Sequence, residues 1–280
     1  MAGQSRAQWR LLDTGPADGF TNMAVDEALL EILAAEKGPP TLRFYSWAPP
    51  ALSLGYGQST AGGIDFRQCA PLGIDVVRRS TGGRAVLHDH EVTYSVVIRA
   101  DDPQVIAGVL ASYLTISHAL VRGLSYLGIT AELMPLRRGV PLPSDDTSPV
   151  CFATTSSYEV VVAGRKIIGS AQRRAHNLVM QHGSIPLSHD LDKLRAVFGS
   201  AWPGGQSALS EQVYQAYMTS LQEAGGRVYS YTEVVAALTR GMTEIWQVDL
   251  LPGHLTTSEK DCSAHLRATK YGADSWTWRR

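Results

Sequence analysis

The chain has 280 residues, of which 44% are hydrophobic and 18% charged, so it can bury a large core and is too apolar for an extended disordered protein. Its 25 lysine and arginine residues face 26 aspartate and glutamate residues, which gives a formal net charge of −1. This balance excludes proteins that bind nucleic acid or anionic membrane surfaces through a large cationic excess.

The N-terminal part of the chain predicts a helix followed by a strand. Apolar residues recur at helical spacing over Asn22–Ala35, where Thr21 or Asn22 can cap the first turn and Gly38-Pro39 ends the helix. Residues Thr41–Trp47 alternate as a strand does. Similar strand patterns recur at Ile74–Arg79, Val92–Ile98 and Tyr158–Ala163. No apolar run reaches the roughly 18–20 residues of a membrane span, so we expect no membrane insertion.

A second helix, a loop and a hairpin are predicted in the middle of the chain. The helix has Asp102 as its cap, Pro103 in its first turn and Gly128 at its end. Four prolines punctuate Pro135–Pro149, a composition typical of a functional loop or a disordered insert. The hairpin that follows is expected to turn at Gly164-Arg165, which would pair Lys166 with Ala163.

The chain after Asp190 is predicted to be mostly helical. The last of its helices opens with the capping-box spacing of Thr256 and Glu259. The four expected helices are Leu191–Phe198, Ser210–Ala224, Thr232–Trp246 and Thr257–Lys270. A helix, a sheet-rich middle and a helical tail together predict an α+β fold rather than a regular βαβ alternation.

The segment Arg78–Asp89 has the most unusual composition of the chain. Adjacent Gly82 and Gly83 follow a predicted strand, and glycine lets a backbone turn with positive φ and approach a ligand closely. The flanking arginines are available for an anionic group, although a plain turn with exposed arginines fits the local pattern equally well. The spacing matches neither a Walker loop nor GxGxxG, and GxSxG is absent from the chain.

The run His88-Asp89-His90-Glu91 raises the question of a metal site. Residues two apart on a strand project to the same side, and imidazole binds zinc well. No HExxH helix and no cysteine ligands accompany these histidines, so we expect no metal here.

The three cysteines are widely spaced, without a CxxC pair, which indicates a reducing cytoplasm rather than a disulfide framework. Cys69 and Cys262 have spacings that suit core packing. Cys151 stands where the proline-rich loop meets a strand, a place where reactive residues are often presented. A thiol needs a nearby cation or base to be nucleophilic at pH 7, and Lys166 is a candidate. The local pattern does not show whether Lys166 meets Cys151 or points outward from an edge strand.

Taken together, these motifs resemble the biotin/lipoate protein ligase and octanoyltransferase superfamily, and within it the Cys-dependent octanoyltransferases of bacterial lipoate assembly. The resemblance covers about Asn22 to Ser184. The segments that carry it are Asn22–Ala28, Arg78–His88, Glu91–Ser95, Cys151-Phe152, Gly164–Gln172 and Gln181–Ser184.

The resemblance implies a fold and a set of site residues. The fold would have mixed, largely antiparallel sheets flanked by helices, with a catalytic domain at residues 1–250 and a helical C-terminal extension packed on it at 251–280. Cys151 would be the acyl-thioester nucleophile, and Lys166 would lower its pKa. Substrate would be bound by Arg79, Thr81, Gly82, Gly83, Arg84, His88, Gly169, Ser170, Ala171 and His182.

The resemblance also implies partners. The donor would be octanoyl-acyl carrier protein, and the acceptor a lysine of a lipoyl-accepting domain such as glycine cleavage H protein or 2-oxoacid dehydrogenase E2. No cofactor is implied, because a thioester already carries its activation. Three alternatives stay open: an ATP-dependent lipoate ligase, an octanoyl amidotransferase between lipoyl domains, and a catalytically silent acyl-binding protein. Cys151 favours the transferase over the ligase, as does Arg84 where the ligase motif has a third glycine.

Overall fold

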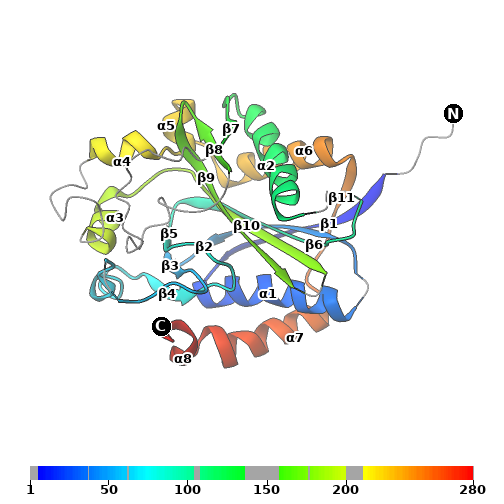
Figure 1. Ribbon diagram of the computed structural model, residues 1–280, viewed down its shortest axis with the longest axis horizontal. Coiled ribbons are helices and arrows are strands. Elements are labelled where there is room, and N and C mark those ends of the chain that lie inside the picture. The colour runs from blue at the N-terminus through cyan, green and yellow to red at the C-terminus, as the bar shows by residue number, and fades with distance from the viewer. Residues whose placement is uncertain are drawn as a thin grey trace.

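The computed structural model describes residues 6–36, 38–61, 63–103, 108–135, 158–175, 177–199 and 211–279. One mixed sheet within these ranges contains β1 (Ala7–Ala17), β2 (Thr41–Trp47), β6 (Glu91–Arg99), β7 (Glu132–Pro135), β8 (Tyr158–Val162), β9 (Arg165–Ala175), β10 (Leu178–Pro186) and β11 (Val248–Pro252). Their order is β11-β1-β2-β6-β10-β9-β8-β7 (Figure 1). β1 runs parallel to both β2 and β11, and the other neighbours are antiparallel. The predicted α+β class and largely antiparallel sheet are confirmed.

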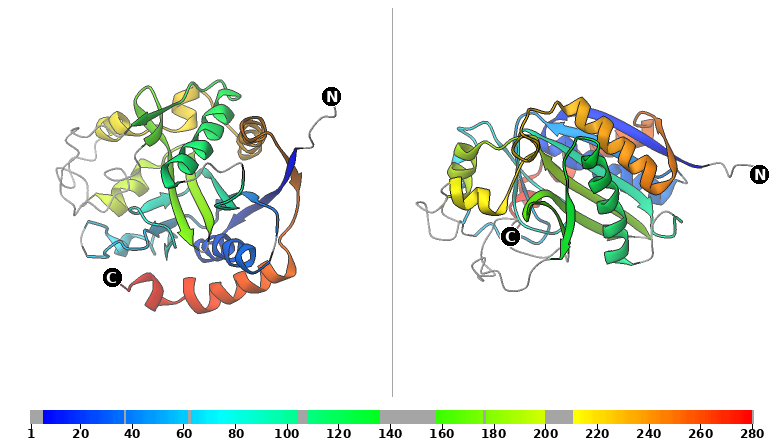
Figure 2. Two further views of the ribbon diagram at one scale, coloured as in Figure 1. Left: turned by 45° about the vertical axis from the view of Figure 1, so that its right-hand side comes forward. Right: turned by 90° about the horizontal axis from the view of Figure 1, so that it is seen from above.

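Helices cover both faces of this sheet. α1 (Gly19–Ala35) lies on one face, with α7 (Thr257–Leu266) alongside it (Figure 2). α2 (Val109–Ser125) and α6 (Tyr231–Trp246) lie together on the other face. They cross where a Cβ on Gly241 would come within 2.3 Å of the Gly123 nitrogen, so glycine is what permits this close approach. No described helix is both long and apolar enough to cross a membrane.

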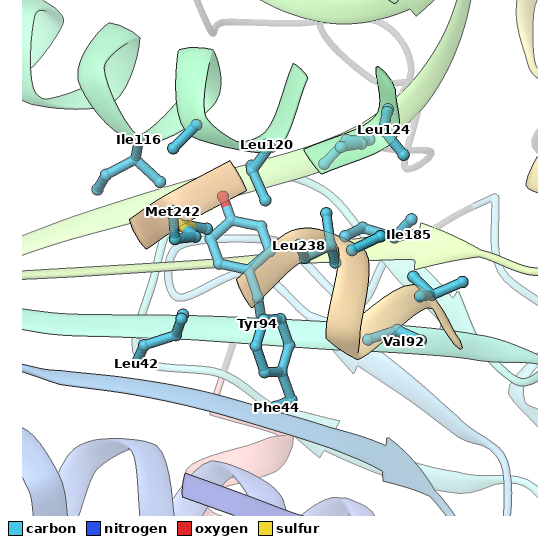
Figure 3. Packing of buried hydrophobic residues seen from close by; sticks show 14 of the residues in the cluster. Leu42, Phe44, Val92, Tyr94, Ile116, Leu120, Leu124, Ile185, Leu238 and Met242 are labelled. Atoms are coloured by element: carbon cyan, nitrogen blue, oxygen red, sulfur yellow. The ribbon is translucent and has the colours of Figure 1, made fainter. Parts of the chain in front are cut away.

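Alternation along the strands divides the interior into two layers. Leu42 and Phe44 of β2 pack toward α2 and α6, where Figure 3 shows them beneath apolar side chains of both helices. Arg43 and Tyr45, which alternate with them along β2, project to the α1 face instead. That face therefore receives the polar side chains of β2 at these two positions.

A smaller sheet and several short helices complete the fold. The smaller sheet, in the order β4-β3-β5, consists of β3 (Ala51–Leu54), β4 (Asp75–Arg78) and β5 (Val86–His88). The short helices are η1 (Phe66–Gln68), α3 (Leu191–Phe198), α4 (Glu211–Tyr217), α5 (Leu221–Gly225), the π-helical turn η2 (Arg267–Tyr271) and α8 (Asp274–Thr277).

Two predicted helix starts are wrong. α1 begins at Gly19, because the Asp18 side chain accepts from the Thr21 nitrogen at 2.7 Å and caps the helix earlier than expected. α2 begins only at Val109, after Gly108. Asp102, its expected cap, instead closes a turn after β6 by donating its backbone N–H to the Arg99 carbonyl.

Two further predictions need correction in the second half of the chain. The hairpin turns at Ala163-Gly164, both with positive φ, so Lys166 pairs with Val161 and not with Ala163. The helix expected over Ser210–Ala224 is broken between α4 and α5, because Met218 forms a parallel bridge with Lys166. The Thr256–Glu259 capping box is present, although regular α7 ends at Leu266.

The division at residue 250 stays a prediction. That residue lies inside β11, which pairs with β1. Beyond it, the C-terminal helices pack against α1, and Lys270 and Tyr271 both donate to the buried Glu27 carboxylate.

Candidate active site

A cavity of about 560 Å³ lies between the two sheets, α1 and the first turn of α2. Its walls are mixed in character: Met23, Trp47, Val86 and Tyr113 are apolar or aromatic, whereas the strands contribute polar side chains. Its volume is in the range of small-molecule sites in proteins. We therefore take it as the candidate active site.

The register of the large sheet explains the polar floor of this cavity. Residues directly opposite one another across strands share a face. One such row, across β2, β6, β10 and β9, consists of Tyr45, Thr93, Ser184 and Gly169. The neighbouring row on the same face consists of Arg43, Ser95, His182 and Ala171. Most members of the two rows line the cavity, so the sequence positions of the site follow from strand pairing.

Lys166 reaches the cavity through a β-bulge. Val161 pairs with Lys166 but Val160 pairs with Ile168, so β9 carries one extra residue at this point. Plain alternation would place Lys166 on the opposite face from Gly169, and the extra residue reverses that. The Lys166 side chain then lies over Gly169, where a Cβ would be 3.6 Å from the Lys166 Cε. Lys166 is 8% exposed and lines the cavity, rather than pointing outward.

Both ends of the Lys166 residue are held. Its carbonyl accepts from the Thr219 nitrogen at 2.9 Å, in the break between α4 and α5. Its Nζ donates to Oε1 of Glu159 at 2.5 Å. The two side chains of this ion pair are 10% and 18% exposed.

The glycine loop is held from inside by two arginines. Arg79 donates to the carbonyls of Ser53, Gly82 and Arg84, and Arg78 donates to the carbonyls of Gly55 and Gln58. Both arginines are buried, so the alternative of a turn with exposed arginines is wrong for them. Gly82 and Gly83 line the cavity, and Gly83 has a φ of +91°, which favours glycine.

His88 belongs to a buried hydrogen-bonded cluster around Glu91. Its Nδ1 is 2.8 Å from Oε1 of Glu91, its Nε2 is 2.8 Å from the Ser53 hydroxyl, and its ring stacks on Trp47. Glu91 also accepts from Trp47, Thr93 and Ser184. Burial alone would raise the pKa of Glu91, but His88 and the hydroxyl donors outweigh it and lower that pKa.

His182 is held in a second buried cluster. Its Nδ1 is 3.0 Å from Oδ2 of Asp26, and its Nε2 is 2.7 Å from the Thr81 hydroxyl. Asp26 also accepts from Arg43 and from the Tyr45 hydroxyl. Burial would raise the pKa of Asp26, and Arg43 with His182 lowers it. Thr81 is thus oriented by a histidine that is itself oriented by α1.

The predicted site residues are distributed unevenly around the cavity. Among the described residues that line it are Arg79, Gly82, Gly83, His88, Lys166, Gly169, Ser170, Ala171 and His182. Thr81 contacts the site through His182, and Arg84, half-buried, stands outside the lining. The described residues include no group of three His, Cys, Asp or Glu side chains that could hold a metal ion.

Cys151 lies outside the described residues, as do residues 136–150 of the proline-rich loop. Pro135 and Tyr158, the described residues that bracket this stretch, pair with each other across β7 and β8. The other two cysteines are poor nucleophiles. Burial raises the pKa of the Cys69 thiol to about 11, and burial together with Glu31 raises that of Cys262 to about 11.

Several polar residues around the site were assigned no role from the sequence: Asp26 and Glu91 stand inside the motif segments, and Glu159 stands outside them. Asp26 carried a detectable signal, because it stands four residues after Asn22 and three before Leu29, which puts a carboxylate on a helix face that also carries buried apolar residues. Glu159 carried none, since an acid near the start of a strand is ordinary on a solvated face.

The comparisons with known proteins decide the family. The model of the lipoyl protein ligase A/B catalytic domain matches residues 18–243. The chain belongs to this family. Octanoyltransferase LipM of Moorella thermoacetica is 44% identical over 272 residues, covering 97% of this chain and 98% of the relative. Octanoyltransferase LipM of Bacillus subtilis is 37% identical over 275 residues, covering 97% and 98%. The predicted activity is confirmed at this level: the protein is an octanoyltransferase.

Solved structures agree with this assignment. A crystal structure of lipoate-protein ligase A bound with ATP has a TM-score of 0.77 and 25% identity, covering 97% of this chain and 98% of that chain. A bipartite lipoate protein ligase from Thermoplasma acidophilum, described with its E2 lipoyl domain, has a TM-score of 0.78 and 25% identity, covering 97% and 96%. The protein therefore shares its fold with solved structures that are described as lipoate protein ligases.

Proposed function

We propose that this octanoyltransferase takes its acyl group from octanoyl-acyl carrier protein, carries it as a thioester on Cys151, and passes it to a lysine of a lipoyl-accepting domain. The acceptor would be a glycine cleavage H protein or a 2-oxoacid dehydrogenase E2, and the reaction would take place in the cytoplasm. The observation that carries the proposal is Lys166, a cation turned by a bulge into the wall of a cavity large enough for an acyl chain.

The chemistry divides into two balanced steps. In the first, the Cys151 thiolate attacks the donor's thioester carbonyl, the bond from that carbonyl to the pantetheine sulfur breaks, and the departing thiolate takes a proton from Lys166. In the second, the acceptor amine attacks the acyl-cysteine, the bond to the Cys151 sulfur breaks, and the nitrogen's proton passes to neutral Lys166. The amide forms and the enzyme returns to its starting state.

Two features of the described residues support Cys151 as the nucleophile. Cys69 and Cys262 have thiols with raised pKa values, so neither is a useful thiolate at neutral pH. Cys151 is seven residues from Tyr158, a tether that spans at most about 25 Å when extended. That reach is compatible with a reaction at Lys166, on the strand next to β8.

The decisive experiment is to mix the protein with octanoyl-acyl carrier protein in the absence of ATP and to measure the mass of the intact chain. We expect one octanoyl adduct, lost in Cys151→Ala, kept in Cys262→Ala, and discharged when a lipoyl domain is added. A strict requirement for ATP would instead assign the chemistry of a lipoate ligase. An adduct that forms from an octanoylated lipoyl domain but not from the carrier protein would assign an amidotransferase.

The lysine has its own test. Lys166→Ala removes a cation and leaves the Glu159 carboxylate without this counter-charge. The lost positive charge and the unbalanced negative charge should both raise the pKa of Cys151. We expect alkylation of Cys151 by iodoacetamide to require a higher pH in this variant. An unchanged alkylation profile would remove the role proposed for Lys166.

A further inference from the structure

We propose that Glu159 is a positioning residue of the transfer reaction, which fixes the Lys166 ammonium group at the cavity wall and keeps it protonated. This inference rests on the role proposed above for Lys166. It concerns a residue outside the matched glycine, lysine and cysteine motifs. The observation is the 2.5 Å contact from the Lys166 Nζ to Oε1 of Glu159, made between two strands at the edge of the cavity.

The local backbone is arranged so that this contact forms. Val160 pairs with Ile168, so the residue before it, Glu159, stands beside Gly169. The aliphatic part of Lys166 crosses Gly169 on its way to the carboxylate, and a Cβ on Gly169 would be in ordinary van der Waals contact with the Lys166 Cε at 3.6 Å. The Lys166 backbone is fixed on one side by Val161 and on the other by Thr219. With the backbone fixed, the Glu159 carboxylate holds the ammonium group at this point of the cavity wall.

Burial makes the charge of Glu159 matter. A lysine that is only 8% exposed is pushed toward its neutral form, because desolvation disfavours a charge. A carboxylate in direct contact opposes that effect and favours the ammonium form. The first step of the reaction needs this form, since the ammonium group stabilises the thiolate before attack and supplies the proton to the departing sulfur. Glu159 therefore acts on the reaction through Lys166.

Other titratable groups line the cavities that border Lys166, and all of them are present in every Glu159 variant. Lys166 also borders a second, narrower cavity of about 70 Å³. The titratable and charged groups on the walls of the two cavities are Arg79, His88 and His182 in the larger one, and Asp89, His90, Glu91, His189, Asp190 and Tyr214 in the narrower one. Tyr45 and Tyr113 also line the larger cavity. A difference between Glu159 variants is consequently assigned to Glu159 itself.

The test compares the pH dependence of Cys151 acylation, measured as single-turnover adduct formation by intact mass, in wild type, Glu159→Gln and Glu159→Asp. Loss of the Lys166 proton should set the alkaline limb of this profile. In Glu159→Gln we expect that limb to move to lower pH by about one unit or more, since an opposite charge in contact typically shifts a pKa by about 1–3 units. Glu159→Asp keeps the charge with a shorter reach, so it should restore part of the shift.

A matched control is available in α5, which contacts the same hairpin through Arg165. Glu223 pairs with Arg165, the neighbour of Lys166, at 3.2 Å, with both side chains about a third exposed. Glu223→Gln removes one carboxylate from this region and should leave the profile unchanged. The inference is overturned if the alkaline limb of Glu159→Gln stays at the wild-type pH. It is also overturned if Glu159→Gln and Glu159→Asp lower the acylation rate equally while the alkaline limb stays where it is. If Lys166→Ala also leaves the profile intact, the proposed function of Lys166 fails as well; if Lys166→Ala changes it, only the inference about Glu159 fails.

Discussion

Arg43 and Asp26 form an ion pair inside the protein, directly beneath the cavity. Nη1 of Arg43 donates to Oδ1 of Asp26 at 2.7 Å, and the two side chains are 1% and 2% exposed. Arg43 comes from β2 and Asp26 from α1, so the pair joins the helix to the polar face of the sheet. The other carboxylate oxygen of Asp26 contacts His182, which makes the pair part of the support of the site.

Removing the arginine should be costly for stability. Arg43→Met leaves the Asp26 carboxylate buried without its main counter-charge, and breaking a buried pair in this way typically costs about 3–5 kcal/mol. The measurement is the free energy of unfolding from urea denaturation. Arg99→Met is the control, because the Arg99–Asp101 pair is 45% and 62% exposed and should contribute no more than about 1 kcal/mol. Equal effects of the two substitutions would contradict this account of the buried pair.

Acid should destabilise the protein through three buried carboxylates. The pKa values of Asp26, Glu27 and Glu91 are lowered in the folded protein: burial raises each, but Arg43, Lys270 with Arg173, and His88 respectively outweigh it. Their contribution to stability is fully present above the unfolded value of about 4 and is lost as the pH falls through the lowered folded values. We expect these three carboxylates to make the urea midpoint fall as the pH drops below about 4. A urea midpoint that rises on acidification would contradict the predicted loss of stability.

The sequence predicted those parts of the fold that depend on local pattern. The strand Thr41–Trp47, the helix Leu191–Phe198 and the cap formed by Thr256 and Glu259 all rest on spacing within a short segment, and all are found. β11 was missed, because its residues lie unassigned between two predicted helices and become a strand only through their pairing with β1.

The site could be predicted only as a set of motifs. The bulge that turns Lys166 into the cavity arises from pairing between β8 and β9, and a turn placed one residue late gives the wrong partner. Asp26, far from His182 in sequence, meets it only because α1 packs on the sheet. Such contacts depend on tertiary packing, which local periodicity does not encode.

The crossing of α2 and α6 should be sensitive to a single methyl group. A Cβ on Gly241 would lie 2.3 Å from the nitrogen of Gly123 and 2.6 Å from the Ala119 carbonyl oxygen. Both are backbone atoms, so the helices must move apart and loosen the core between them and the sheet. We expect Gly241→Ala to cost about 1–3 kcal/mol, measured by urea denaturation. Gly57→Ala, where the Cβ would meet nothing within 4 Å, should cost much less.

Gly183 should be equally sensitive to an added methyl group, and here the strain should also affect the transfer reaction. A Cβ there would lie 2.6 Å from Cε1 of Tyr94 and 2.7 Å from the Gly169 carbonyl oxygen. Tyr94 is enclosed in the core, so the strain falls on β9, which must shift relative to β10. That shift would displace Gly169 and the Lys166 side chain that crosses it.

We therefore expect Gly183→Ala to lower the rate of Cys151 acylation by about tenfold or more, since small displacements of a reacting group have effects of this size. The rate should be measured per folded molecule, well below the melting temperature. Gly241→Ala is the control for general backbone strain, because the α2 residues that its Cβ would meet, Gly123 and Ala119, are not among those that line the cavity. If both variants lose the same activity per folded molecule, the loss reflects general weakening of the fold; if only Gly183→Ala loses it, the close packing of β9 on β10 is what holds the lysine in place.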